Sequence, residues 1–358
     1  MTWITATYRI RAPRAQLDDF ARGLALEQSV ELSDAAVTDA FVRERVMGRV
    51  AAIRPGAADV HDVDLHLATV TTGLDVAQTL NMLFGNASLH PNVALVDVVF
   101  PPEVTAEFQG PRFGIAGVRA RLGVADRPLS CAALKPQGLS SEALAALCYT
   151  LAVNGVDVVK DDHGLADQAY SPFAERVAAI AGSVGRTRYV PSLSGDLDTM
   201  RRQIDVACTH GIDAVLIAPM LAGWATMQTV VRQYPDVAFF AHPTMGGAAR
   251  IAPDLLIGKL FRLLGADAVI FPNHGGRFGY TPETCRRLAD RARAAWDGIR
   301  PCVPVPAGGM TLERVPEMLD FYGPDAMLLI GGSLLAARER LTEETAAFTR
   351  AVAQHSYR

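Results

Sequence analysis

Cysteine is scarce in this sequence, and long apolar runs are absent. The five cysteines among 358 residues are odd in number and far apart: Cys131, Cys148, Cys208, Cys285 and Cys302. This spacing suits neither a disulfide framework nor a metal-ligand set, so we expect a protein of the reducing cytoplasm. The most apolar stretch, residues 214–227, is broken by Pro219 and Gly223 and is too short to cross a bilayer.

The sequence also lacks any concentration of charge of one sign. Lysine and arginine together number 34 and aspartate and glutamate 38, which gives a formal net charge of −4. Nucleic-acid and membrane-surface proteins need a basic patch or block, and the charges here are scattered. The first residues do not have the pattern of a signal peptide. We therefore expect neither a nucleic acid nor a membrane as a partner.

From about Leu129 onward the chain repeats a unit made of a short apolar run followed by an amphipathic helix. The runs cover residues 129–134, 156–159, 188–193, 214–217, 237–241, 268–271, 302–305 and 326–330. The helical patterns include residues 141–153, 173–180, 196–208 and 281–296. Continuous apolar runs are typical of parallel strands buried on both faces. Eight such units predict an α/β protein with a (β/α)₈ TIM barrel over residues 123–358.

The residues before the barrel follow a different pattern. Residues 3–11 and 93–99 look like strands, and residues 13–27 and 75–83 look like helices. This mixture predicts a small N-terminal α+β domain, ferredoxin-like, over residues 1–122. The connection between the two domains is expected at residues 108–117, where prolines and glycines cluster.

Ionisable side chains and glycines stand at the predicted strand ends, where a barrel carries its catalytic groups. Lys135 ends the first run, residues 160–163 (KDDH) end the second, His242 the fifth and His274 the sixth. The seventh and eighth runs end in glycine pairs: Gly308, Gly309, Gly331 and Gly332. Glycines let backbone N–H groups approach an anion, so two pairs on adjacent strands favour a phosphate site over two simple tight turns.

The KDDH segment allows two interpretations. Asp162 and His163 are plausible ligands of a divalent cation, whereas an ammonium on Lys160 has no lone pair and could join them only as a carbamate. The alternative is a salt bridge within the segment, with Asp162 capping the next turn. For His242 and His274, a catalytic and a structural role are about equally supported.

These motifs resemble, in order and spacing, those of the RuBisCO large-chain family. FQGPRFGI (108–115) resembles the FQGPPHGI connection of that family, and RPLSCAALKPQGLS (127–140) its first barrel strand with the KPKLGLS loop. GVDVVKDDH (155–163) is similar to its GLDFTKDDE activation motif. VPVPAGGM and LLIGGSLL resemble its two phosphate loops. The resemblance covers nearly the whole chain.

The resemblance implies roles for individual residues. Lys160 matches the lysine that CO₂ carbamylates and that binds Mg²⁺ together with the residue at Asp162. Lys135 matches the lysine that transfers protons to and from the enediol, and His242 matches a histidine near the reacting carbons. The four loop glycines match the backbone that holds one substrate phosphate.

The same resemblance implies a partner subunit. Glu27, in LALEQSV, and Asn81, in LNMLFGN, match N-terminal-domain residues that reach into the active site of the other subunit. A homodimer, or an assembly of dimers, is therefore expected.

Four departures from the family pattern affect the expected chemistry. His163 replaces a glutamate that is the third metal ligand, so Mn²⁺ or Zn²⁺ are alternatives to Mg²⁺ because imidazole suits them. Gln137 replaces a second lysine, and Pro243 replaces an arginine that holds the second phosphate. Arg277 lies near the position of the mobile-loop lysine. The sequence therefore resembles the form IV, RuBisCO-like branch, for which CO₂ fixation is not expected.

What remains supports formation of a metal-stabilised enolate from a phosphorylated keto-sugar or sugar acid. The KDDH variant and the loop NHGGRFG incline us to a decarboxylase, C–C lyase or hydrolase of an oxo-isoapionate-phosphate-like substrate. An enolase or isomerase of a methylthioribulose-type phosphate is the alternative. A Schiff-base aldolase using Lys135 or Lys160 and a catalytically silent ligand-binding protein also remain open. The candidate catalytic residues are Lys135, His163, His242 and His274, and Arg277 is a candidate substrate-binding residue.

Overall fold

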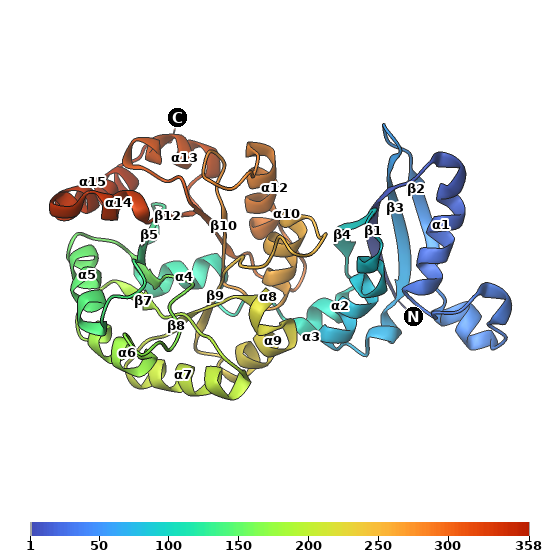
Figure 1. Ribbon diagram of the computed structural model, residues 1–358, viewed down its shortest axis with the longest axis horizontal. Helices are drawn as coiled ribbons and strands as arrows, with labels where there is room; N and C mark the ends of the chain where they lie inside the picture. Colours follow the sequence, from blue (N-terminus) through green and yellow to red (C-terminus); the bar gives the residue numbers. More distant parts are fainter. Residues whose placement is uncertain (1, 358) are drawn as a thin grey trace. The chain divides into compact units, whose positions relative to one another are not determined.

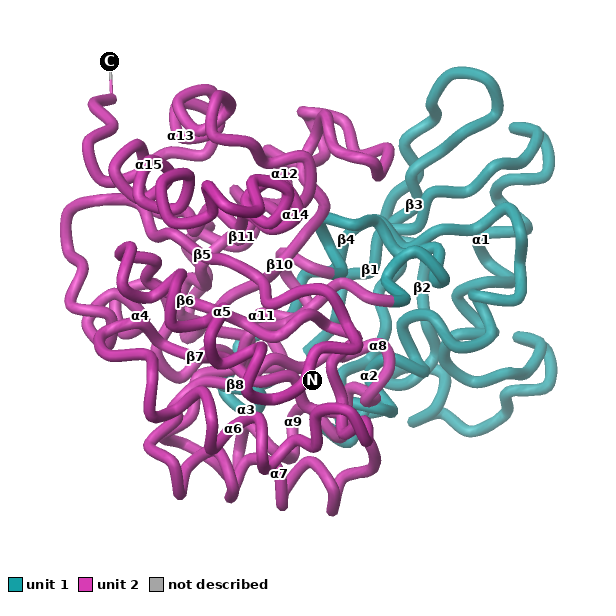
Figure 2. The backbone as a smooth tube through the Cα atoms, turned by 60° about the vertical axis from the view of Figure 1, so that its left-hand side comes forward, with its two compact units in different colours: residues 1–109, 245–256 teal, residues 110–244, 257–358 magenta. Residues whose placement is uncertain are grey.

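The computed structural model describes residues 2–357, and the chain divides into two compact units (Figure 2). Unit 1 contains residues 1–109 and 245–256, and unit 2 contains residues 110–244 and 257–358. The first boundary therefore lies at Gln109, before the expected position at residue 122. The physical reason is that α4 (Gly114–Leu122) buries Val118 in the barrel core.

Unit 1 has the ferredoxin-like order of elements. Its four-stranded sheet has the order β2-β3-β1-β4, and all three neighbouring pairs are antiparallel. The strands are β1 (Trp3–Arg11), β2 (Arg49–Arg54), β3 (Val60–Ala68) and β4 (Val93–Val99). The helices are α1 (Arg14–Glu27), α2 (Val76–Phe84), α3 (Pro102–Phe108) and the short α10 (Pro253–Leu255), and a π-helical turn covers Val42–Val46. The chain order β1-α1-β2-β3-α2-β4 with this sheet order defines the split βαβ arrangement.

Burial alternates along β1 and β3, as expected for a sheet with one covered face. Ile4, Tyr8 and Ile10 of β1 are fully buried, and so are Val63 and Leu65 of β3. The residue after each of these is more exposed. This period of two fixes which face of the sheet is packed.

Unit 2 is a barrel of eight parallel strands in the order β7-β6-β5-β12-β11-β10-β9-β8 (Figure 1). The strands are β5 (Leu129–Leu134), β6 (Val158–Asp161), β7 (Arg188–Val190), β8 (Ala214–Ile217), β9 (Ala238–Ala241), β10 (Ala268–Pro272), β11 (Val303–Ala307) and β12 (Met327–Ile330). A parallel bridge between Ser192 and Leu216 joins the two ends of the sheet and closes the ring. The expected barrel is confirmed.

Helices surround the ring of strands in Figure 1. They are α5 (Ser141–Val153), α6 (Phe173–Ala181), α7 (Leu197–Thr209), α8 (Pro219–Ala222), α9 (Trp224–Gln233), α11 (Phe261–Leu263), α12 (Pro282–Arg293), α13 (Val315–Tyr322), α14 (Gly332–Ala336) and α15 (Leu341–Ala353). Side chains of Ser140, Asp196 and Thr281 cap the N-termini of α5, α7 and α12 by accepting backbone N–H bonds. No helix within residues 2–357 combines the length and the apolar character that a membrane span requires.

Alternate residues of the strands fill the inside of the barrel. The core cluster takes every second residue: Leu129, Cys131 and Ala133 of β5, Ala238 and Phe240 of β9, Ala268 and Ile270 of β10, Val303 and Val305 of β11, and Met327 and Leu329 of β12. Val118 of α4 joins this cluster, so α4 closes the N-terminal end of the barrel. Chemistry is therefore confined to the opposite, C-terminal end.

Candidate active site

The alternation along the strands brings three ionisable side chains to the C-terminal mouth of the barrel. In β5 the inward series Cys131, Ala133 continues to Lys135. In β6, Val158 points inward and Lys160 is the next residue on that face, as His242 is after Phe240 of β9. Because strand side chains alternate between faces, these three continue the apolar core as a polar layer.

Asp162 connects two of the predicted catalytic groups. Its Oδ1 atom lies 2.6 Å from Nζ of Lys135 and 3.4 Å from Nδ1 of His163. Burial alone would raise the pKa of Asp162, but hydrogen bonds from His163 and Lys135 hold it well below the usual aspartate range. Asp162 is therefore ionised at neutral pH and fixes the position of Lys135.

His163 and His242 face each other as a stacked pair. Their ring centroids are 4.3 Å apart and the ring planes differ by 10°. Nδ1 of His242 lies 2.6 Å from Oγ1 of Thr244, which orients the ring. Burial, followed by the charge of Lys160, lowers the pKa of His242 to about 2, so His242 is neutral at working pH.

Lys160 is buried, and its Nζ donates to the backbone carbonyl of Asp161 at 2.6 Å. Burial lowers its pKa, and the charge of Lys135 acts in the same direction. The neutral amine is the form that reacts with CO₂ to give a carbamate. Burial therefore favours the modification that the sequence implies.

Gln137 packs against the backbone of Gly164. A Cβ atom on Gly164 would lie 1.7 Å from Nε2 of Gln137, so a larger residue there would force the end of this side chain to move. Gln137 is a neutral group beside Gly164, the residue after His163, and it stands in the position where the family has a second lysine. This places the departure from the family pattern next to the KDDH segment.

Two glycine loops line the mouth after β11 and β12. Gly308 and Gly309 have φ values of 85° and 66°, a conformation that favours glycine. A Cβ atom on Gly309 would lie 2.6 Å from Cα of Gly276, so the loops after β10 and β11 pack backbone against backbone. The nearest atom to a Cβ on Gly331 is Cε of Lys135, at 4.0 Å. The β12 loop therefore borders Lys135, as a phosphate loop beside the reacting carbons should.

His274 and Arg277 are not brought together with the cluster of Lys135, Asp162, His163 and His242. The ring of His274 lies 4.7 Å from the ring of Phe321 on α13, and its Nε2 atom is buried with no hydrogen-bond partner among residues 2–357. Burial lowers the pKa of His274. This placement favours packing over catalysis, and the catalytic role of His274 stays a prediction.

Arg277 is exposed and its guanidinium lies 5.5 Å from the ring centroid of its neighbour Phe278. Arg277 lies in the loop of residues 273–281, and its role in binding the substrate stays a prediction. Two of the glycines of this loop pack against the loop after β11 and so link its base to the phosphate site.

Glu27 and Asn81 lie together in unit 1. They line one pocket with Gln28, Ser29, Glu31, Thr71, Gln78, Met82 and Asn86. Oε1 of Glu27 accepts a hydrogen bond of 2.7 Å from Nδ2 of Asn86. The two residues predicted to serve a partner subunit therefore share one polar surface.

The predicted metal ligands Lys160, Asp162 and His163 form an incomplete donor set as they stand. Asp162 supplies a carboxylate and His163 a ring nitrogen, but the Lys160 amine is a hydrogen-bond donor. Among residues 2–357, no three side chains of His, Cys, Asp or Glu come together in a way that could hold a metal ion. A carbamate on Lys160 would add the missing oxygen ligand, so the residues fit a divalent ion once this lysine is modified.

Two positioning groups were missed at the level of sequence. Arg314 donates to the carbonyls of Gly309 at 2.9 Å and of His274 at 3.2 Å, and so links the loops after β11 and β10. Thr244, which orients His242, follows it by two residues. Neither belongs to a motif of charged residues, and no pattern in the sequence separates them from ordinary surface residues.

Comparisons with known proteins agree with this geometry. Residues 114–338 match the family model of the ribulose bisphosphate carboxylase large chain, catalytic domain. The chain is 53% identical to a 5-methylthioribulose-1-phosphate isomerase of Rhodospirillum rubrum, over 98% of this chain and 96% of the relative. It is 52% identical to ribulose bisphosphate carboxylase-like protein 1 of Rhodopseudomonas palustris, over 98% of both chains. A crystal structure of a Rubisco-like protein from R. palustris covers 100% of this chain and 99% of its own, with 45% identity and a TM-score of 0.92.

The family match over the barrel and the similarity over the full length lead to one assignment. The chain belongs to the RuBisCO large-chain family and is an enzyme of its RuBisCO-like branch.

Proposed function

We propose that this enzyme isomerises a ketose monophosphate of the 5-methylthioribulose-1-phosphate type through an enediolate. The observation that carries the proposal is the Lys135–Asp162–His163 group beside the Gly331 loop, in a chain with 53% identity to an isomerase of that name. The relatives favour this alternative over the oxo-isoapionate-phosphate decarboxylase or lyase that the KDDH segment first suggested.

The reaction needs one proton to leave the carbon next to the carbonyl and a proton to be delivered to the former carbonyl carbon. A hydroxyl proton also passes from one of the two oxygens to the other, so that there is no net change in atoms. Lys135 is the proton carrier, because its Nζ is held by Asp162 at 2.6 Å and borders the phosphate loop. The neutral His242 supplies a ring nitrogen to the hydroxyls of the substrate, since its Nδ1 is already held by Thr244. General acid–base groups in this arrangement contribute about 10²–10⁴-fold to rate.

A divalent ion would be held by Asp162, His163 and a carbamate on Lys160. When bound, such an ion polarises the carbonyl of the substrate and so acidifies the neighbouring C–H bond. Mg²⁺ is the proposed ion, with Mn²⁺ and Zn²⁺ as alternatives because one ligand is an imidazole.

The substrate should carry one phosphate. Gly308, Gly309, Gly331 and Gly332 supply backbone N–H groups at one side of the mouth. On the other side Pro243 follows His242 and offers no cation to a second phosphate. A neutral, apolar end on the substrate suits Pro243 better than a phosphate does.

The proposed assembly is a homodimer, in which Glu27 and Asn81 of each subunit serve the site of the other. The support is the pocket that these two residues share in unit 1 together with their match to the family pattern. A cytoplasmic location is part of the same proposal.

The test is turnover of 5-methylthioribulose 1-phosphate in D₂O, followed by NMR. Isomerisation through an enediolate should place deuterium on the carbon that receives the proton, and Lys135→Met should remove both exchange and product. Ribulose 1,5-bisphosphate with labelled CO₂ serves as the control substrate and should give no labelled phosphoglycerate. Turnover without deuterium incorporation at any carbon, or labelled phosphoglycerate, would contradict the proposal.

A further inference from the structure

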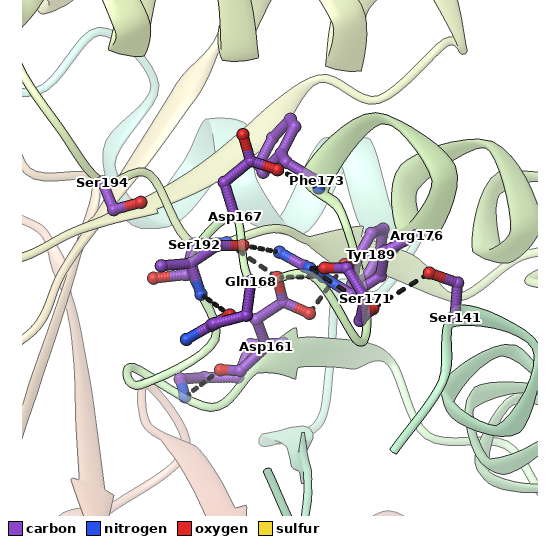
Figure 3. Close-up of polar contacts among 12 residues, drawn as sticks. Ser141, Asp161, Asp167, Gln168, Ser171, Phe173, Arg176, Tyr189, Ser192 and Ser194 are labelled. Atoms are coloured by element: carbon purple, nitrogen blue, oxygen red, sulfur yellow. Dashed lines mark hydrogen bonds and ion pairs between the residues drawn. The ribbon is translucent and has the colours of Figure 1, made fainter. Parts of the chain in front are cut away.

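A buried ion pair lies directly behind the candidate site, on the outer side of β6 (Figure 3). Lys160 points into the barrel, so the next residue, Asp161, points outward towards α6. Asp161 and Arg176 of α6 have side chains with 0% exposure, and Nε of Arg176 lies 3.1 Å from Oδ2 of Asp161. The isomerisation proposed above uses neither of them.

Asp161 is paired by groups of β7, the segment after β7 and α6. Its Oδ1 accepts from the hydroxyl of Tyr189 at 2.6 Å, and its Oδ2 also accepts from the backbone N–H of Ser192 at 3.0 Å. The carboxylate is therefore a fixed anchor in the wall of the barrel.

Arg176 connects this anchor to the loop that begins with Asp162 and His163. Nη1 of Arg176 donates to the carbonyl of Ser171 at 2.7 Å, and Nη2 donates to the carbonyl of Ala166 at 2.9 Å. The planar guanidinium thus holds two points of residues 162–172 while it faces Asp161. A lysine amine could not reach all three groups in this geometry.

Further bonds make the same loop a compact unit. Nε2 of Gln168 donates to the carbonyl of Gly164 at 2.7 Å, and Oδ1 of Asp167 accepts from the backbone N–H of Phe173 at 2.7 Å. The backbone N–H of Leu165 bonds to the carbonyl of Asp162 at 2.9 Å. Ala166 and Ser171 therefore belong to the same hydrogen-bonded loop as Asp162 and His163.

Stability alone is a weak reason for this arrangement. Burial of two charges costs desolvation, and a buried ion pair gains little over well-packed apolar residues. A buried pair can instead fix the geometry on which a site depends. Mutation of outer groups that orient metal ligands typically lowers metal affinity or activity by about 10–100-fold.

We propose that Asp161 and Arg176 are positioning residues, which hold the loop of residues 162–172 so that Asp162 and His163 stay aligned with Lys135 and His242. The expected effect of these residues on kcat rests on the proposed function of the site. Their expected effect on the order of the loop rests on the contacts alone. Asp161 belongs to the KDDH segment, but neither its side chain nor that of Arg176 reaches the mouth of the barrel, and no role was expected for either of them.

The experiment compares Arg176→Lys with Arg262→Lys. Arg262 is the matched control, because it is a buried arginine of the same barrel that also holds main-chain carbonyls, those of Arg291, Ala294, Ile299 and Arg300. Those carbonyls precede β11 and so lie at the N-terminal end of the barrel, away from the site. Both variants keep the charge, and both should lower the melting temperature.

Arg176→Lys should lower kcat about tenfold or more with KM within about twofold, and should weaken Mn²⁺ binding, measured by EPR, about tenfold. Arg262→Lys should change none of these quantities. Hydrogen exchange of the amides of residues 163–168 should become faster in Arg176→Lys and stay unchanged in Arg262→Lys. Since this exchange needs neither substrate nor metal, it decides the inference even where the isomerase proposal fails.

Two results would overturn the inference. One is equal loss of melting temperature in both variants with kcat, Mn²⁺ affinity and loop exchange unchanged, which would make the pair purely structural. The other is a rise in KM at constant kcat in Arg176→Lys, which would place its effect on substrate binding. If Arg176→Lys does not fold, Tyr189→Phe replaces it as the test variant, because it removes one hydrogen bond from Asp161 and leaves the ion pair. The same outcomes for kcat, KM and exchange rates then support or overturn the inference.

Discussion

At the scale of residues, lysine is the most informative amino acid of this chain. The sequence has three lysines, Lys135, Lys160 and Lys259, and its other basic side chains that stay charged are arginines. Two of the three lie at the barrel mouth. Arginine is effectively always protonated, whereas an amine can lose its proton and attack CO₂. Lys135 and Lys160 thus stand where an amine can supply chemistry that a guanidinium cannot.

Replacement of these lysines by arginine tests that interpretation. Lys135→Arg keeps the ion pair with Asp162 but cannot carry a proton, so kcat should fall by about 10²-fold or more. Lys160→Arg cannot form a carbamate and should lose Mn²⁺ binding as measured by EPR. Lys259→Arg is the control, because Lys259 stacks on Trp296 outside the site, and it should keep wild-type kcat. Wild-type turnover in Lys135→Arg would exclude it as the proton carrier.

The role of His163 depends on a choice between metal ligand and base. Its Nδ1 lies 3.4 Å from Oδ1 of Asp162 and its ring stacks on that of His242, and these contacts fix the orientation of the ring. As a ligand, His163→Glu should keep activity and shift the metal preference from Mn²⁺ towards Mg²⁺, since a carboxylate suits Mg²⁺ better.

Metal titrations of kcat in wild type and His163→Glu measure this shift. A fall in turnover of about 10²-fold with unchanged metal affinity would instead make His163 the base. His163→Ala completes the series: unchanged rate and affinity in that variant would leave the residue with a packing role only.

At the scale of elements, the glycine loops differ in how much space surrounds them. A Cβ atom on Gly332 would meet nothing within 4 Å, whereas one on Gly309 would lie 2.6 Å from the backbone of Gly276. The first position is therefore open and the second is filled by another loop.

Three substitutions distinguish the effect of an added side chain from the effect of an added charge at these loops. Gly332→Ala should bind inorganic phosphate as the wild type does, while Gly332→Asp should abolish binding because it places a carboxylate where the anion sits. Gly309→Ala should weaken phosphate binding and lower the melting temperature, because its φ of 66° and the contact with Gly276 both oppose a side chain. Isothermal titration with phosphate measures all three. Equal affinity in Gly332→Asp and Gly332→Ala would move the phosphate site elsewhere.

Much of the barrel was predictable because its strands are short apolar runs between capped helices. The helix α5 and the strands β1, β4, β5 and β8 lie where the sequence predicts them. The strands β2 and β3 were missed: β2 is largely exposed, and β3 (VHDVDLHLA) carries charged residues at alternate positions, so neither forms a continuous apolar run. The β3 pattern is nevertheless the period of two that a half-buried strand requires.

The candidate site was predictable only in part, for a physical reason. Strand-end position identifies Lys135, Lys160 and His242, because alternation along a buried strand extends to its last residue. It does not distinguish His274, which follows β10 but turns its ring towards Phe321 of α13. Contacts such as the one between Arg176 and Ala166 join a helix to a loop carbonyl, and such a pairing leaves no pattern in the sequence.

At the scale of the whole molecule, the proposed function requires two chains. Lys135 stands in the barrel and Glu27 in unit 1, and the proposed dimer combines the barrel of one subunit with Glu27 of the other. When two variants are expressed together, each active site of a mixed dimer then contains residues from both variants. This dependence distinguishes a shared site from a dimer with two independent sites.

Mixed dimers of Lys135→Met and Glu27→Gln test the shared site. In a mixed dimer one site carries both defects and the other carries none, so dimers purified with two different affinity tags should recover about half of the wild-type kcat. Each variant alone should be inactive. The matched control is the mixed dimer of Lys135→Met and Lys160→Met, in which every site keeps one defect and no activity should return. Inactive mixed dimers in the first pair, or a monomer by light scattering at assay concentration, would contradict the shared site, because Glu27 would then act within its own chain.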